Sequence, residues 1–243
     1  MANWSDPRPH AAPFRTAATG DRADAYDAGL RSYMLSVYNY MASGVLLTGV
    51  VAMLFASSGY AAQVLNTPLR WVIMLAPLAF VMVLSFGINR LSTATTQALY
   101  WAFAVVMGLS LSSIFLVYTG TSIATTFFAS AAAFAGLSLF GYTTKRDLSG
   151  LGTFLIMGVV GLIVASLLNL WFQSPALNLA ISAIGVLLFA GLTAYDTQRI
   201  KEMYDHVAGT DMMGKAVIMG ALSLYLDFVN MFQFLLSFLG SRE

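Results

Sequence analysis

Apolar residues occur in seven long runs that follow a polar N-terminal stretch. Residues 1–31 carry scattered charges and three prolines before the first run begins. Each run is close to the roughly 20 residues that an α-helix needs to cross a bilayer. The pattern therefore predicts seven transmembrane helices. They cover about residues 33–57, 70–89, 98–118, 122–142, 151–172, 177–197 and 215–239.

Short polar segments that contain glycine, proline or charged residues separate the runs. The break around Gly120 is the slightest, but residues 98–142 have the length for two spans and not for one. The longest break covers residues 199–214. We expect a single transmembrane domain over residues 32–243. The polar residues 1–31 are expected to form a flexible tail and not a signal peptide.

The composition agrees with an all-α integral membrane protein whose main partner is the lipid bilayer. The chain of 243 residues is 58% hydrophobic and 9% charged, whereas a soluble domain carries about 25% charged residues. The net charge of +1 indicates no nucleic-acid partner. The absence of cysteine excludes disulfides and thiolate metal sites.

Lysine and arginine are distributed unevenly between the two sides of the predicted bundle. With the N-terminus inside, ten of the twelve basic residues lie in inner segments, and only Arg70 and Arg242 lie in outer ones. Cytoplasmic segments carry an excess of such residues. The N-terminal tail is therefore expected in the cytoplasm and the C-terminus outside.

The seventh run carries small and polar residues on one face. At helical spacing they form a stripe of Gly220, Ser223, Asp227, Asn230, Phe234 and Ser237. Such residues suit packing against other helices in a membrane. A carboxylate at this depth is costly unless it faces protein or a water-filled cavity. We therefore expect the seventh helix to be the most enclosed one.

Two acids stand out, because only Asp196 and Asp227 of the eleven acidic residues fall within the apolar runs. Intramembrane acids commonly mark ion or proton paths. Asp196 could instead simply end its helix beside Arg199, and Asp227 could make a structural hydrogen bond to another helix. The two acids lie on consecutive antiparallel helices. They can meet only if the seventh helix begins as a cytoplasmic projection or if Arg199 is drawn inward.

If the two carboxylates meet, like charges in a poorly solvated site cannot both ionise cheaply, so the pair is expected to titrate as a unit. The pair would sense proton concentration and, once ionised, offer oxygen ligands to a hard cation. Calcium takes 6–8 oxygens, so two carboxylates favour a transient, water-rich site. Ser223, Asn230 and Arg199 are the supporting polar residues. No cofactor is expected.

Arg90 closes the second run on the same side of the membrane as Asp196. It could be one of the charges that set the topology. It could also be a latch that pairs with an acid in one state and releases it in another.

Several motifs resemble the transmembrane Bax inhibitor motif family in its bacterial branch. Similar segments also occur in the first run and after the fourth. The motifs are Tyr195-Asp196-Thr-Gln-Arg-Ile-Lys201, Ala221-Leu-Ser-Leu-Tyr-Leu-Asp227-Phe-Val-Asn230, Lys145-Arg-Asp-Leu-Ser149 and Tyr38-Asn-Tyr-Met-Ala42. The resemblance extends from about residue 33 to the end of the chain.

The resemblance implies a fold and an activity. It implies seven helices with the seventh central and surrounded by the other six, in a bacterial inner membrane. It also implies a pH-sensitive calcium leak, in which aspartates on helices six and seven share a proton. These aspartates correspond to Asp196 and Asp227, and the family's basic residue near the end of helix two is nearest to Arg90. Bacterial relatives are also linked to membrane-bound AAA proteases.

Three functions therefore compete. The first is a cation leak gated by the aspartate pair. The second is an interaction protein that modulates a membrane-bound AAA protease or another membrane complex, with structural acids and no transport. An intramembrane aspartyl protease is the third. It is disfavoured because Leu224-Tyr225-Leu226, and not a Gly-x-Gly sequence, precedes Asp227, so we do not expect an enzyme.

Overall fold

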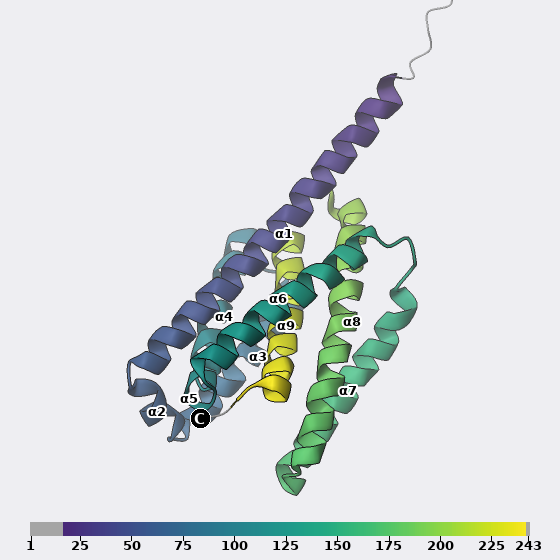
Figure 1. Ribbon diagram of the computed structural model, residues 1–243. Coiled ribbons are helices and arrows are strands. Elements are labelled where there is room, and N and C mark those ends of the chain that lie inside the picture. The colour runs from purple at the N-terminus through teal and green to yellow at the C-terminus, as the bar shows by residue number, and fades with distance from the viewer. Residues whose placement is uncertain (1–16, 242–243) are drawn as a thin grey trace, which may run out of the picture.

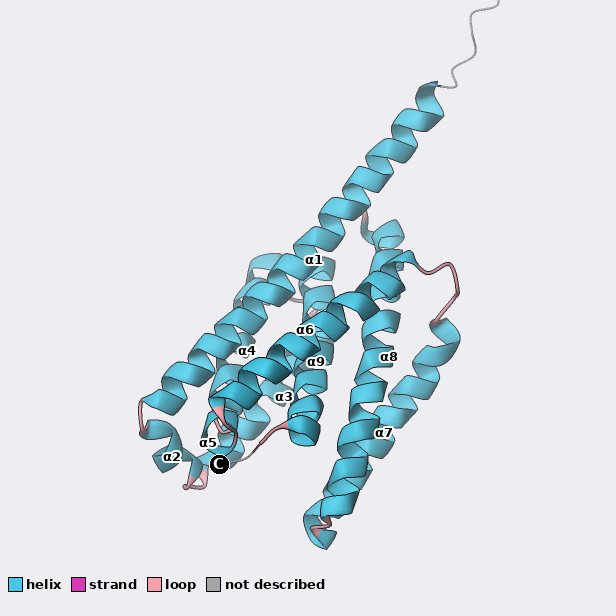
Figure 2. Cartoon of the chain, viewed as in Figure 1, coloured by secondary structure: helices cyan, strands magenta, loops and turns pink. Residues whose placement is uncertain are grey.

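The chain is helical throughout the part that the structure describes (Figure 2). The computed structural model describes the backbone of residues 17–241 and the side chains of residues 24–241. Seven helical segments in this part are long and apolar enough to cross a membrane, which confirms the predicted class and the number of spans. The helices are α1 (Ala17–Ser57), α2 (Tyr60–Leu65), α3 (Leu69–Gly87), α4 (Thr93–Leu111), α5 (Ile114–Val117), α6 (Gly120–Thr143), α7 (Ser149–Phe172), α8 (Pro175–Val207) and α9 (Met213–Leu239).

Several helices begin where the sequence supplies a capping residue. The side chains of Ser92, Thr119 and Ser174 each accept a hydrogen bond from the backbone N–H three residues later, at the starts of α4, α6 and α8. These bonds satisfy donors that the first turn of a helix leaves free. The slight break near Gly120 is thus a true boundary, because Thr119 caps a new helix there.

The third predicted span is divided in two. α4 ends at Leu111 and the single-turn helix α5 follows. The expected uninterrupted helix over residues 98–118 is therefore wrong in detail, although α4 and α5 together still form one apolar span. Ser112 donates its hydroxyl to the Leu109 carbonyl at 2.7 Å. Such local side-chain bonds compete with the regular helical pattern.

The first helix begins earlier than expected. α1 starts at Ala17 and includes residues 17–31, which were assigned to the tail. Good helix formers follow Pro13, so the helix extends backwards from its apolar part. Figure 1 shows the N-terminal part of α1 reaching beyond the other helices. Residues 1–16, the rest of the expected tail, lie outside the described residues.

The sixth span is longer than predicted. α8 continues past residue 197 to Val207, so most of the expected break over residues 199–214 is helical. Tyr204 explains part of this extension, because its ring packs at 5.3 and 5.4 Å from the rings of Tyr26 and Tyr33 on α1. Only a short turn then separates α8 from α9. We call the end of the bundle that contains this turn the α8–α9 end.

α9 is the most buried span. Half of the residues in its most apolar stretch are buried, a larger share than in any other span. It packs against α8, α1, α6 and α4 (Figure 1). α3 and α7 pack mainly against α4 and α8. The expected arrangement of all six other helices around α9 therefore stays a prediction. The outer faces of the spans expose large apolar side chains such as Trp171 and Phe86, as suits lipid contact.

Candidate functional site

The polar stripe of α9 faces α8 along most of its length. A side-chain carbon at Gly220 would lie 3.1 Å from Ile200. Seventeen residues further on, Ser237 accepts a hydrogen bond from Ser182 at 3.0 Å. Between these contacts, the ring of Phe234 stacks on Phe189. The contacts define one antiparallel register, and this register places Asp227 near the level of Asp196.

Asp196 and Asp227 lie at similar depths in the bundle, in contrast to what the lengths of the apolar runs indicated. Asp196 lies eleven residues before the end of α8, and Asp227 lies fourteen residues after the start of α9. Because an α-helix rises about 1.5 Å per residue, the two depths differ by only about 5 Å. The acids reach similar depths because α8 continues to Val207 and α9 starts at Met213, so the two helices form a hairpin that extends past both acids.

The α8–α9 register places the carboxyl groups of Asp196 and Asp227 at similar depths on facing helices. Asp227 is 4% exposed, and its Oδ2 atom makes no hydrogen bond to any described residue. Asp196 is half-buried. A buried carboxyl oxygen without a partner is costly, so a structural hydrogen bond to a neighbouring helix does not explain why Asp227 is there. Whether the pair shares a proton stays a prediction.

The two basic candidates, Arg199 and Arg90, lie in different parts of the structure. Arg199 lies one helical turn after Asp196 and is exposed. Arg90 is exposed in the turn between α3 and α4. Lys215 of α9 donates to the Ile88 carbonyl beside this turn at 3.1 Å. Lys215 precedes Asp227 by about 18 Å along the helix, so the structure does not bring Arg90 to the pair.

The two supporting residues on α9 are both half-buried. Asn230 donates its side-chain amide to the Leu226 carbonyl of its own helix at 2.8 Å. Ser223 lies one turn before Asp227 on the stripe that faces α8. Within the described residues, no group of three or more histidine or acidic side chains is placed to hold a metal ion. A cation at the pair would take its remaining ligands from water or from the backbone.

Sequence reasoning missed two buried hydroxyl chains that join the helices around the site. Tyr38 and Ser138 are hydrogen-bonded at 2.6 Å, and Ser138 is 3.0 Å from Thr197, the residue after Asp196. The hydroxyl of Thr48 donates to the Ala104 carbonyl at 2.8 Å and accepts a hydrogen bond from the Tyr225 hydroxyl at 2.7 Å. The only signal was the presence of hydroxyl residues inside apolar runs.

Comparison with known proteins agrees with these features. A family model described as inhibitor of apoptosis-promoting Bax1 matches residues 30–243. The chain belongs to the Bax inhibitor-like family. It is 49% identical over 242 residues to a protein of Caulobacter vibrioides, with 95% of this chain and 97% of that protein covered. It is 48% identical over 220 residues to the inner membrane protein YbhL of Escherichia coli K12, with 89% and 94% covered.

These relatives support the description of the chain as a multi-pass membrane protein. The family match includes all seven spans except the first residues of α1. Asp196, Asp227 and Arg90 all lie within the matched region.

Proposed function

We propose that the chain is a pH-sensitive cation leak, with calcium as the transported ion, in a bacterial inner membrane. The observation that carries this proposal is the position of two acids on facing helices inside the bundle, where Oδ2 of Asp227 has no hydrogen-bond partner among the described residues. Ionisable residues inside a membrane are rare and mark ion or proton paths.

The pair would act as a gate through its own charge. With one shared proton, the carboxyl groups of Asp196 and Asp227 hold α8 and α9 together. As pH rises and the shared proton leaves, two negative charges repel each other in a poorly solvated site. Separation of α8 from α9 would then admit water, and the two carboxylates would attract calcium, which prefers oxygen ligands. The leak is thus expected to increase with pH.

Basic residues would tune the gate. Arg199 lies close enough to act on Asp196 from the α8–α9 end. Arg90 would act as a latch only in another state, because in this structure it remains in the exposed α3–α4 turn. Lys215 at the start of α9 donates a hydrogen bond to the Ile88 carbonyl beside that turn. A movement of α9 would therefore also move the turn that carries Arg90.

Calcium flux from liposomes that contain the purified protein tests the proposal. Wild type should leak more as pH rises, whereas Asp196→Asn with Asp227→Asn should give a leak that no longer responds to pH. Glu202→Gln is the matched control, because Glu202 is an exposed acid of α8 outside the pair. A double variant that keeps the wild-type pH profile would remove the pair from the mechanism.

A second candidate function is modulation of a membrane-bound AAA protease without transport. The first part of α1 favours it, since residues 24–28 are exposed and the N-terminal part of α1 reaches beyond the other helices (Figure 1). This candidate predicts no calcium flux from the purified protein at any pH, together with a change in protease activity when α1 is shortened. The flux assay therefore separates the two functions.

A further inference from the structure

A pocket opens between α1 and α6. Its volume is about 580 Å³, within the 300–1,000 Å³ of small-molecule sites. Eleven residues line it, and all of them come from α1 and α6. α1 and α6 each pack against α9 but hardly against each other. The pocket is therefore a gap between two helices that both pack against α9.

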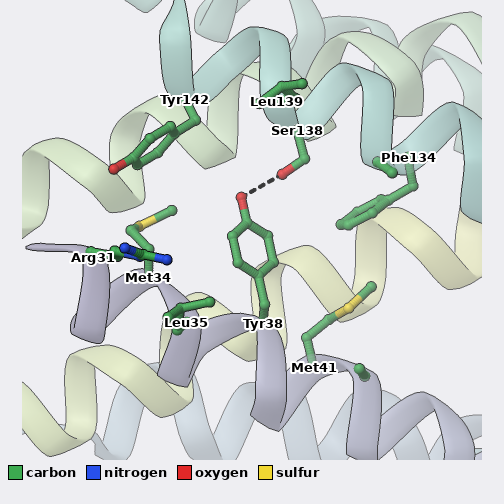
Figure 3. Close-up of a pocket in the computed structure, with 11 residues that line it drawn as sticks. Arg31, Met34, Leu35, Tyr38, Met41, Phe134, Ser138, Leu139 and Tyr142 are labelled. Carbon is green, nitrogen blue, oxygen red and sulfur yellow. Dashed lines mark hydrogen bonds between the residues drawn. The ribbon is translucent and has the colours of Figure 1, made fainter.

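The pocket has an apolar part and a polar part. Figure 3 shows Arg31 and Tyr142 toward one end, Phe134 and Met41 toward the other, and the hydrogen bond from Tyr38 to Ser138 between them. Met41 and Phe134 are buried, at 6% and 7% exposure. An occupant must therefore present a long apolar group next to a polar one.

The polar end is positively charged. Arg31 is exposed and lines the pocket, and no acid does so. Lys201 of α8 adds a second positive charge behind Tyr142, with its ammonium 5.0 Å from the centre of the Tyr142 ring. Asp27, the nearest acid to Arg31 in the sequence, is not part of the lining. The charge at this end suits an anionic group.

The sequence around Arg31 predicts that it lies at the depth of the lipid headgroups. It is the last charged residue before an uncharged stretch that continues to Arg70, so it marks the edge of the apolar part of α1. Basic pockets between transmembrane helices bind anionic lipid headgroups. Tyr142 at the same end is a residue type that gathers at this interface.

We propose that the α1–α6 pocket binds one anionic phospholipid, with an acyl chain along Met41 and Phe134 and its phosphate at Arg31. Neither Asp196 nor Asp227 lines the pocket, and this proposal does not depend on the proposed leak. A zwitterionic lipid would bring its own positive headgroup to Arg31 and Lys201, so net anionic lipids should be preferred.

Lipid titration of the delipidated full-length protein, followed by native mass spectrometry, tests the proposal. Phosphatidylglycerol should bind more tightly than phosphatidylcholine with the same acyl chains. Arg31→Gln should weaken phosphatidylglycerol binding about fivefold, which corresponds to about 1 kcal/mol, and should weaken phosphatidylcholine binding less. Lys145→Gln is the charge control, because Lys145 is exposed in the α6–α7 connection and does not line the pocket.

A steric variant tests the acyl-chain part of the site. Ala135 is exposed and lines the pocket, whereas Ala133 is exposed on the same helix and does not. Ala135→Trp should weaken the binding of both lipids, and Ala133→Trp should weaken neither, with unchanged circular dichroism in both variants. Glycerol 3-phosphate should not displace the lipid.

Four results would overturn the proposal. The first is an equal affinity of wild type for the two lipids, and the second is wild-type lipid preference in Arg31→Gln. The third is wild-type lipid binding in Ala135→Trp. Displacement by glycerol 3-phosphate at the concentration of the lipid would also overturn it, because the pocket would then recognise phosphate alone.

Discussion

Single residues in this bundle matter most where two backbones approach each other. Gly141 of α6 faces the backbone of α8, and a side-chain carbon at this position would come closer to the Ala194 carbonyl than any real contact allows. Small residues at such crossings let transmembrane helices pack closely. The crossing lies two residues before Asp196, so it also fixes the position of the acid relative to α6.

Gly141→Ala is therefore expected to destabilise the protein by about 1–3 kcal/mol, the usual cost of overpacking a tight contact. Thermal unfolding in detergent measures the effect. Gly136→Ala is the control on the same helix, because a side-chain carbon there would meet nothing within 4 Å. Equal unfolding temperatures for the two variants would show that the α6–α8 crossing is looser than described.

At this scale the sequence indicated which residues are unusual but not what they touch. Asp196 and Asp227 were found because charge is rare in apolar runs. Tyr38 and Thr48 were missed, because a hydroxyl in an apolar helix can bond to its own backbone or to another helix. Only the packing of α1 against its neighbours shows whether such a hydroxyl bonds to its own helix or to another one.

The helices themselves were largely predictable, because apolar length and capping residues both show in the sequence. Their ends on the α8–α9 side were not. α8 and α1 continue beyond the apolar runs since Tyr204, Tyr26 and Tyr33 pack together there. Contacts between residues so far apart in the chain leave no local signal. This extension is what brings the two acids to similar depths.

The start of α7 gives a prediction about pH at the scale of an element. Asp147 accepts hydrogen bonds from the side chain and the backbone N–H of Ser149, and these bonds hold the pKa of Asp147 below its usual value. The stabilisation is therefore complete above the unfolded pKa of about 3.9 and is lost as pH falls through the lower, folded pKa.

Amide hydrogen exchange at Ser149 measures this effect. Asp147→Ala should exchange faster than wild type at neutral pH, because the amide loses its acceptor. The ratio of the two exchange rates should approach one in strong acid, where the wild-type carboxylate is protonated. A ratio that does not change with pH would contradict the role of the ionised carboxylate.

For the whole molecule, the distribution of charge predicts the orientation in the membrane. The chain has no cysteine, so single-cysteine variants can be made without first replacing native cysteines. On intact spheroplasts, an impermeant maleimide should label Arg70→Cys, before α3, and should not label Lys145→Cys, after α6. Both positions are exposed. The reverse labelling pattern would place the N-terminus outside.

The central claim at this scale is that α8 and α9 are held together by one shared proton. Infrared spectroscopy of the reconstituted protein, titrated with pH, tests it most directly by following the band of protonated carboxyl groups. We predict a band that disappears over the pH range in which calcium flux rises, and a displaced titration of Asp227 when Asp196→Asn removes its partner. An Asp227 titration that is the same with and without Asp196 would contradict the claim, because groups that share a proton cannot titrate independently.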